Sequence, residues 1–537
     1  MNAPAARTLD GLLREWARRR PDGPAVVAGE ERPVYRELLG RALGAAARLR
    51  ALGVRPGDRV GLLADNRAGW LDVCFGAALL GAPLAAFNTW VTEGELDHLL
   101  RHSGVRVLVA ADVVSGNDLR GHLRALVPGP WDAVDSARYP ALRAVTGFPL
   151  AAAPPVAVPG PTPGGAALPG SASTDVALPG SASTDVALVL YTSGSTARPK
   201  AVPLLHGELV ENGFGIGERM GLTPDDRVWL GSPLFWSFGS ANALMATVTH
   251  GATLVLQAPF EPAAAVALME RERCTAAYLL PTITRALLPH APHGLRTVRT
   301  GLTIGAPAEV RLAAEGLGVR GICNVYGATE TYGNCAVTPH DAPLEVRLMS
   351  QGPPLPGVRI RVVDPRTRAE LPPGEVGELE VTGHVTPGYH DGTPADDAAF
   401  TADGHYRTGD LGRLDKRGWL RFAARASELI RSSGINVSPA EVEERLRTHP
   451  AVAEVAVVGV PDERAGEAVV AFVVPVPGAV TTPEELRAHC RAGLASYKTP
   501  SRVVLLDELP RTPTGKLSRR ALRGAGAGAQ AGDPTGE

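Results

Sequence analysis

The sequence predicts an α/β protein with a large N-terminal domain of parallel α/β sheets, a β-rich subdomain, and a small, mobile α+β domain at the C-terminus. Residues 58–330 alternate short β-branched or apolar runs with longer amphipathic ones, which is typical of βα units around a parallel sheet. Between 359 and 420 the pattern changes to short alternating strands separated by Pro-Gly, Asp-Gly and Arg-Gly turns. After residue 425 helices and strands are mixed in one compact segment.

In the first of these regions we expect short strands of apolar and β-branched residues bounded by polar residues or glycine. The predicted strands are 60–64, 187–191, 227–230, 253–256, 275–280 and 321–326. The segments 241–249 and 262–273 are predicted helices, because Gly or Pro opens or closes each of them.

The later elements and the domain limits follow from the same signals. We expect strands within 376–382 and 407–421, and then a helix, two strands and a helix at 439–448, 455–460, 468–474 and 482–493. The large domain is placed at 1–426 and the small one at 427–523. An Ala/Pro/Gly-rich insertion lies near 150–180, and its part 150–170 and the tail 524–537 bury too little to offset their ordering entropy, so we expect neither to be structured.

The charge balance excludes several classes of partner. Lys and Arg number 54 and Asp and Glu number 56, so the net charge is −2 and no global field attracts nucleic acid or an anionic membrane. The longest apolar stretches are interrupted by Gly or Pro and are too short to span a bilayer. The first ten residues carry charges and lack the apolar core of a secretory signal. We therefore expect a cytoplasmic protein with no nucleic-acid partner and no membrane span.

The cysteine pattern indicates reduced thiols. The chain has five scattered cysteines and no CxxC pair, which argues against a disulfide framework and against a structural zinc site. We expect these thiols to be mostly buried.

The segment LPGSASTDVA occurs twice in succession, at 168–177 and 178–187. Such a unit is far too short for a solenoid repeat. The second copy runs directly into the predicted strand 187–191, so we interpret the first copy as a structurally neutral loop insertion on the surface.

The strongest local signal is the segment YTSGSTARPK at 191–200, where a predicted strand runs into hydroxyls, a glycine and a lysine. Glycine-rich loops hold phosphate with such hydroxyls, with backbone N–H groups and with a lysine charge. The chain contains no G-x-x-x-x-G-K-[ST] string, which weakens a reading as a P-loop NTPase. On these residues alone, an ordinary Ser/Thr-rich turn is an equal alternative. The candidate phosphate ligands are Thr192, Ser193, Gly194, Ser195, Thr196 and Lys200.

This loop resembles the phosphate loop of the adenylate-forming superfamily, which includes acyl-CoA synthetases, nonribosomal peptide adenylation domains and luciferases. Later segments resemble the family's other motifs in the same order and extend the resemblance over nearly the whole chain. They are YGATE at 326–330, YRTGD at 406–410, the segment 425–441 and PRTPTGK at 510–516. The resemblance implies activation of a small carboxylic acid with ATP and Mg²⁺ to acyl-AMP, followed by transfer of the acyl group to coenzyme A.

The resemblance also implies roles for single residues in the nucleotide site. Joining a carboxylate to AMP brings two anions together, so the site must neutralise charge. Glu330 would bind Mg²⁺, Thr329 would contact the α-phosphate, and Tyr326 would lie against the adenine ring. Asp410 and Arg425 would hold the ribose hydroxyls. Taken alone, Asp410 would more often be a turn residue.

Catalytic roles are implied for Lys516, Thr196, Lys200 and Glu330, with Lys516 reaching the site in one of two domain orientations. The hinge would lie at Ser427, and Gly434 would line the tunnel by which the thiol enters. A glycine suits a narrow tunnel because it lets the ligand approach the backbone.

For the acyl pocket we expect Trp236, Gly305 and Ala306 to be lining residues. An ordinary core aromatic remains the alternative for Trp236. The chain departs from the family pattern at three positions, with Ala197 in place of glycine, Ser427 in place of a charged residue, and Trp236 where histidine is common.

Within the family, amino-acid-activating members carry an aspartate near Trp236. Residues 231–246 contain no acidic side chain, so a substrate ammonium would be desolvated without a partner and an acid lacking that group is favoured. We expect coenzyme A to be the acceptor, with an acyl-carrier protein as the alternative. A catalytically impaired nucleotide-binding homologue is the alternative from another class, suggested by the three departures.

Overall fold

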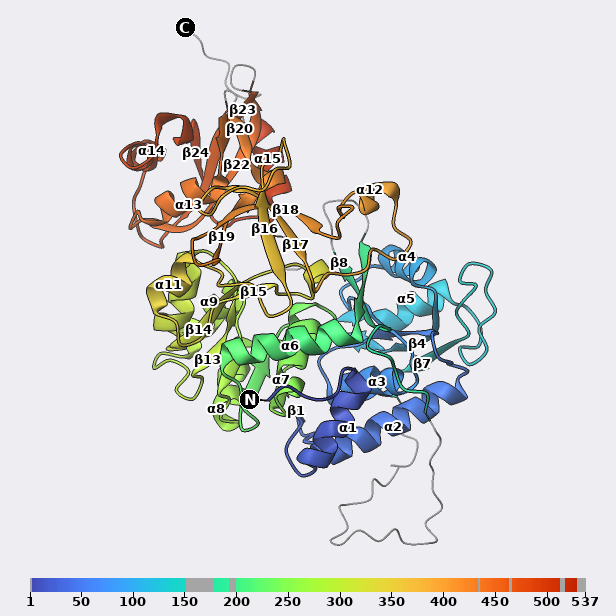
Figure 1. Cartoon of the computed structure of the whole chain (residues 1–537). Coiled ribbons are helices and arrows are strands. Elements are labelled where there is room, and N and C mark those ends of the chain that lie inside the picture. Colours follow the sequence, from blue (N-terminus) through green and yellow to red (C-terminus); the bar gives the residue numbers. More distant parts are fainter. Residues whose placement is uncertain are drawn as a thin grey trace, which may run out of the picture. The chain divides into compact units, whose positions relative to one another are not determined.

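The structure, a computed structural model, describes residues 2–150, 178–192, 199–432, 435–462, 466–511 and 517–528. The chain divides into two compact units, one of residues 1–360 and 381–406 and the other of 361–380 and 407–537 (Figure 1). The hinge at Ser427, which sets the predicted limit between the domains, stays a prediction. Most of the predicted insertion near 150–180, with the first copy of the repeat, lies outside the described residues.

The first unit contains a six-stranded sheet in the order β7-β4-β2-β3-β8-β9. All neighbours pair in parallel except β9, which returns antiparallel to β8. Its strands are β2 (Arg59–Leu63), β3 (Leu84–Ala86), β4 (Val105–Ala110), β7 (Ala144–Gly147), β8 (Val186–Thr192) and β9 (Lys200–Leu205).

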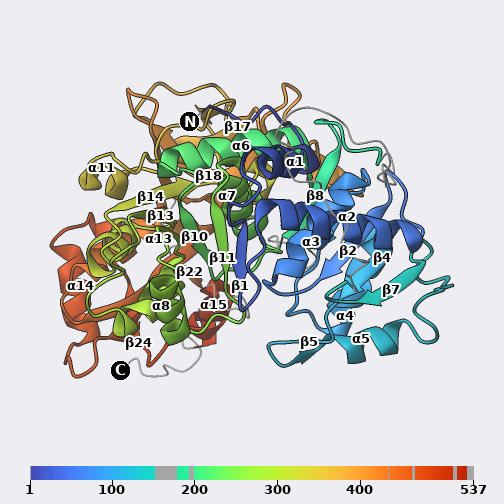
Figure 2. The same ribbon diagram turned by 90° about the horizontal axis from the view of Figure 1, so that it is seen from below.

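Besides a two-stranded sheet of β5 (Val113–Val114) and β6 (Asn117–Asp118), the unit contains a seven-stranded sheet in the order β1-β11-β10-β12-β13-β14-β15. It is parallel apart from β15, and the N-terminal strand β1 lies beside β11 (Figure 2). The predicted strands 227–230, 253–256 and 321–326 are confirmed with the same bounds. The strands are β1 (Val26–Ala28), β10 (Arg227–Leu230), β11 (Thr253–Leu256), β12 (Ala276–Tyr278), β13 (Thr300–Thr303), β14 (Gly321–Tyr326) and β15 (Ala336–Val337).

Helices pack on both sheets, and some contact both, as α3 (Ala68–Leu79) does through β1, β2 and β3. The helix α6 (His206–Met220) contacts β8, β9, β13 and β14 and can be followed in Figure 1. It ends where Gly221 adopts the left-handed conformation with φ 65°. The other helices of this unit are α1 (Leu9–Arg19), α2 (Tyr35–Ala51), α3 (Ala68–Leu79), α4 (Glu93–Ser103), α5 (Leu119–Leu126), α7 (Met245–Thr249), α8 (Pro262–Arg271), α9 (Pro281–Leu287), α10 (Pro307–Arg311), α11 (Leu344–Met349) and α12 (Pro394–Asp397).

The predicted helix 241–249 differs from the structure in type and start. A π-helical segment, Phe238–Leu244, precedes the short helix α7. Burial explains the difference. Residues 239–249 are all buried, so the sequence shows no alternation of apolar and polar positions from which the start of the helix could be located.

The second unit holds most of a four-stranded sheet and all of a five-stranded one. The first has the order β16-β17-β18-β19, and in the second β21-β20-β23-β22 is extended by β24 beside β23. The predicted α+β character of this part is confirmed. Its elements are β16 (Arg359–Val363), β17 (Gly377–Thr382), β18 (Tyr406–Leu414), β19 (Leu420–Arg425), β20 (Ile430–Ser432), β21 (Ile435–Val437), α13 (Pro439–Arg447), β22 (Val452–Asp462), β23 (Gly466–Pro475), α14 (Pro483–Arg491), β24 (Arg502–Leu505) and α15 (Arg519–Gly528).

The predicted start of the unstructured tail, residue 524, is wrong because it falls within a helix. Helix α15 continues to Gly528, so the first residues of the segment 524–537 are helical, and residues 529–537 lie outside the described part. Leu522, only 1% exposed, anchors this helix against Val458, Val470 and Phe472. Such burial supplies the stabilisation that the Gly/Ala-rich composition alone did not indicate.

The cysteines behave as expected. All five are free and buried. Among the described residues, no helix combines the length and apolar character needed to cross a membrane.

Candidate functional site

The predicted phosphate loop joins two antiparallel strands. β8 ends at Thr192 and β9 begins at Lys200, and these two residues are register partners. The two ends of the loop are therefore fixed side by side at the edge of the six-stranded sheet. Ser193, Gly194, Ser195, Thr196 and Ala197 lie outside the described residues, so their roles stay predictions.

Lys200 contacts two side chains that the sequence analysis did not single out. Its ammonium lies 2.6 Å from Oδ1 of Asp396 and 4.7 Å from the centre of the Tyr389 ring. The hydrogen bond from Lys200 is the largest cause that lowers the pKa of Asp396, to about 2. Asp396 is therefore ionised at neutral pH, and the Tyr389 ring adds a cation–π contact to the ion pair.

Glu330 lies in a short 3₁₀ turn, Thr329–Thr331, that follows β14. It is 8% exposed, and its Oε1 accepts a hydrogen bond from the Tyr389 hydroxyl at 2.7 Å. The hydroxyl of Thr329 donates to Oγ of Ser237 at 3.2 Å. A nearly buried carboxylate fits Mg²⁺, which prefers hard oxygen ligands and shares its other positions with phosphate and water.

Several candidates gather at one edge of the seven-stranded sheet. Trp236 follows β10, Gly305 and Ala306 follow β13, and Tyr326 ends β14. These strands run in the same direction through β12, so their carboxyl ends share an edge. Open α/β sheets bind ligands at this edge, which favours the assignment of the pocket and adenine residues.

Trp236 belongs to a group of three aromatic rings. Its ring centre lies 5.3 Å from that of Trp90 and 6.0 Å from that of Phe235, and Trp90 lies 5.5 Å from Phe235. All three pairs are nearly perpendicular, which is a favourable geometry for aromatic rings. Trp90, which precedes α4, was missed because no sequence pattern relates it to Trp236.

In the second unit, Asp410 on β18 faces Arg425 on β19. Nε of Arg425 lies 3.0 Å from Oδ1 of Asp410, whose side chain is 13% exposed. Thr408 positions Asp410, because the Thr408 hydroxyl donates to the Leu379 carbonyl at 2.8 Å and accepts from the backbone N–H of Asp410 at 3.0 Å. The two predicted ribose residues are therefore brought together.

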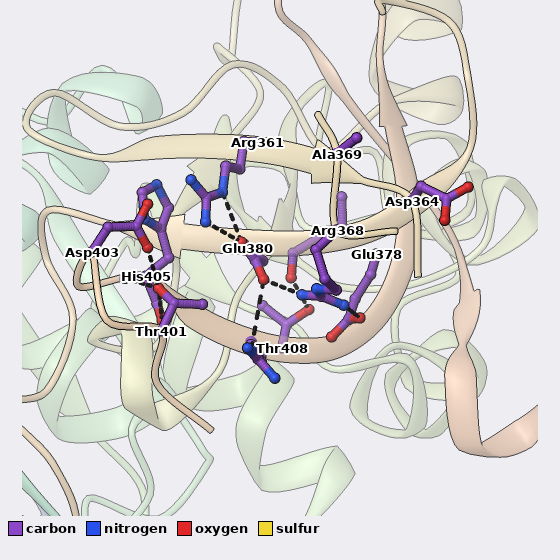
Figure 3. A network of polar contacts seen from close by, with 12 residues as sticks. Arg361, Asp364, Arg368, Ala369, Glu378, Glu380, Thr401, Asp403, His405 and Thr408 are labelled. Carbon is purple, nitrogen blue, oxygen red and sulfur yellow. Dashed lines mark hydrogen bonds and ion pairs between the residues drawn. The ribbon is translucent and has the colours of Figure 1, made fainter. Parts of the chain in front are cut away.

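Figure 3 shows the polar support of this sheet. Glu380 on β17 is 1% exposed and pairs with Arg361 and Arg368, and Nε of Arg361 lies 2.7 Å from its Oε2. Buried carboxylates need such partners, so the ion pairs hold β16, β17 and the 364–369 turn together. The Thr401 and Asp403 side chains in the same view are bonded to each other within the first unit.

The remaining candidates are not tested by these contacts. Ser427 lies in the turn Ala426–Glu428, immediately after β19. Gly434 and Lys516 lie outside the described residues. Their assigned roles stay predictions.

Comparison with known proteins bears on these assignments. The family model described as AMP-binding enzyme matches residues 13–390, and the model of the AMP-binding enzyme C-terminal domain matches 441–516. Feruloyl-CoA synthase from an Amycolatopsis species is 34% identical over 517 residues, which is 94% of this chain and 96% of that protein. The fatty acid–acyl-carrier-protein ligase ScoC from Streptomyces coeruleorubidus is 33% identical, with 97% of each chain covered. The crystal structure of ATP-bound MatB from Rhodopseudomonas palustris has a TM-score of 0.81 at 28% identity and covers 95% of this chain and 98% of its own.

Proposed function

We propose, for a chain that belongs to the AMP-binding enzyme family, a two-step ligation of a carboxylic acid to a thiol. The enzyme joins the acid to AMP from ATP and releases pyrophosphate. It then transfers the acyl group to coenzyme A and releases AMP.

One arrangement carries the assignment of the site. Lys200, at the end of the phosphate-loop hairpin, and Glu330, at the carboxyl edge of the seven-stranded sheet, both contact Tyr389. A cation for phosphate and a carboxylate for a metal ion are therefore held beside one aromatic ring. To neutralise the charge of a nucleoside triphosphate, the ammonium of Lys200 and the carboxylate of Glu330, which would hold the metal ion, need to lie near each other.

In the first step, a carboxylate oxygen of the acid attacks the α-phosphorus and the bond to pyrophosphate breaks. Lys200 and the loop hydroxyls would hold the phosphates, and Lys516 would offset the charge that gathers where the acid and the α-phosphate join. Glu330 would hold Mg²⁺, which when bound neutralises phosphate charge. Asp410 and Arg425 would hold the ribose, so that the adenylate stays in place for the second step.

The acceptor thiol is proposed to be that of coenzyme A. The names of the relatives include both a CoA synthase and a carrier-protein ligase. Thioester formation with CoA alone supports the proposal, whereas a reaction that requires a phosphopantetheinylated carrier protein would replace CoA as the acceptor.

The acid is proposed to lack an α-ammonium group. Residues 231–246 carry no acidic side chain, and the aromatic group around Trp236 offers apolar surface instead. We also propose a cytoplasmic location, where ATP and coenzyme A are present, and the five free cysteines are consistent with a reducing compartment.

The test is ATP/pyrophosphate exchange measured over a panel of aliphatic, alicyclic and aromatic acids, with amino acids as a comparison class. Acid-dependent exchange followed by CoA thioester formation is the expected result. Exchange with amino acids alone would contradict the assignment of the acid, and no exchange with any acid would favour a catalytically impaired homologue.

A further inference from the structure

Residues 386–396, here called the tie segment, connect the phosphate-loop hairpin with the Glu330 turn. The hydroxyl of Thr386 donates to the carbonyl of Pro203 on β9 at 2.7 Å. The backbone N–H of Thr386 donates to the carbonyl of Glu330 at 2.8 Å. The tie segment is therefore bonded to both parts of the proposed nucleotide site.

Tyr389 lies in the middle of the tie segment and contacts a charge on each side. Its hydroxyl bonds to Oε1 of Glu330, at the edge of the ring, and the ammonium of Lys200 lies over the ring face. Phe400 packs against the same ring at 5.8 Å, nearly edge to face, and limits its rotation.

The phenol is a dependable donor. Between a phenol and a carboxylate oxygen the hydroxyl donates the bond, and Oε1 of Glu330 accepts it at 2.7 Å.

Asp396 keeps the Lys200 ammonium on the ring face. Its Oδ1 lies 2.6 Å from Nζ, while its Oδ2 accepts bonds from the backbone N–H and the hydroxyl of Thr393, both at 2.8 Å. These two bonds fix the carboxylate at the start of α12, so its position does not depend on Lys200.

Two opposite charges in one site would normally pair directly. A Lys200–Glu330 pair would occupy both groups that the proposed function needs for phosphate and for Mg²⁺. Tyr389 instead gives Glu330 a neutral donor and gives Lys200 a neutral ring. Glu330 thus meets a neutral donor instead of a cation, and Lys200, whose ammonium has three N–H donors and gives one to Asp396, keeps donors for a ligand.

We propose that Tyr389 is a positioning residue for adenylation, an inference that rests on the proposed function. It keeps the carboxylate of Glu330, which would bind the metal ion, separate from the ammonium of Lys200, which would bind phosphate, and it orients both groups. The thioester-forming step, which starts from acyl-AMP, does not require this arrangement of the β- and γ-phosphate contacts.

The experiment compares Tyr389→Phe and Tyr389→Leu with the parent chain in ATP/pyrophosphate exchange. Tyr389→Phe keeps the ring and loses the bond to Glu330, so the Mg²⁺ concentration at half-maximal rate should rise roughly tenfold while KM for ATP at saturating Mg²⁺ stays nearly unchanged. Tyr389→Leu also lets Lys200 pair with Glu330, so both quantities should rise. Thioester formation from supplied acyl-AMP and CoA should be largely spared in both variants.

Tyr332→Phe is the matched control. Its hydroxyl is buried and accepts a bond from Leu205 N at 3.0 Å on the same strand β9, and no hydrogen bond joins it to a carboxylate within the described residues. An unchanged Mg²⁺ requirement in Tyr389→Phe, or an equal shift in Tyr332→Phe, would overturn the proposal. Absence of exchange in the parent chain would instead contradict the proposed function. Melting temperatures of all variants separate these results from loss of folding, and Tyr389→Phe carries the test if Tyr389→Leu does not fold.

Discussion

Arg425 donates from Nε to Oδ1 of Asp410 across 3.0 Å, and the two residues are cross-strand partners on β18 and β19. The carboxylate of Asp410 is thus oriented before any ligand binds. Pre-orientation lowers the entropy lost when the ribose hydroxyls bind.

Asp410→Asn should raise KM for ATP roughly tenfold, because hydroxyl bonds to a charged acceptor are stronger than bonds to a neutral amide. The measurement is the KM in pyrophosphate exchange for ATP and for its 2′-deoxy and 3′-deoxy analogues. The parent chain should discriminate against both analogues, and the variant should discriminate less. Equal discrimination by the two proteins would remove Asp410 from the ribose site.

Glu330→Gln should lose magnesium-dependent adenylation and fold normally, since the change removes one charge and preserves the shape and an acceptor for Tyr389. The rate is followed against Mg²⁺ concentration, with circular dichroism as the folding control. Turnover that is unchanged at limiting Mg²⁺ would contradict the metal assignment.

Lys516→Ala should reduce adenylation by roughly 10²–10³-fold, by analogy with the loss of one preorganised donor. Thioester formation from supplied acyl-AMP and CoA should be nearly unaffected, because the resemblance places Lys516 at the site in the first orientation alone. Both half-reactions are measured on the same preparation.

A matched control for this lysine is Lys416→Ala, an exposed lysine in the turn between β18 and β19. It should leave both half-reactions unchanged. Equal losses in the two half-reactions of Lys516→Ala would refute the two-orientation mechanism. Near-normal exchange would refute the role of Lys516 itself.

Trp236→Ala should improve kcat/KM for bulkier acids relative to small ones, because the indole would no longer fill the acyl pocket. The ratio of kcat/KM values between a bulky and a small acid is the measured quantity. Loss of all acids in equal proportion would assign Trp236 to the core group with Trp90 and Phe235 instead.

Deleting one copy of LPGSASTDVA should change the free energy of unfolding by less than about 1 kcal/mol, because loop length affects closure entropy weakly. Deleting either copy gives the same chain. The retained copy can make the contacts now seen in 178–187, where the Ser181 hydroxyl donates to Ala78 O and the Asp185 and Ser183 carbonyls accept from the start of α6. Chemical denaturation and the exchange rate check this. A large loss in either would show that the first copy has a role of its own.

Sequence patterns located the sheet strands well where burial is continuous. β10, β11 and β14 have their predicted bounds because each is a mostly apolar run that is followed by glycine or a polar residue. They could not locate the π-helical turn before α7, since nothing in a fully buried segment distinguishes one helical period from another. The helix at the end of the chain was missed because it depends on docking rather than on composition.

Candidate site residues could be named from the sequence where a role is carried by one motif, and those roles stay predictions. Glu330, Asp410 and Lys200 each stand next to residues that indicate their role. Tyr389 and Asp396 were missed because their importance lies in contacts with residues far away in the sequence. No local spacing encodes such pairs.

The buried cysteines have a consequence for an enzyme that makes a reactive intermediate. An acyl-adenylate is an electrophile, and thiolates are the side chains most ready to attack it. Burial raises the pKa of the Cys74 and Cys323 thiols to about 12, so both stay protonated in the core. With every cysteine of the chain buried, no exposed cysteine thiolate competes with the incoming acceptor thiol for the electrophile.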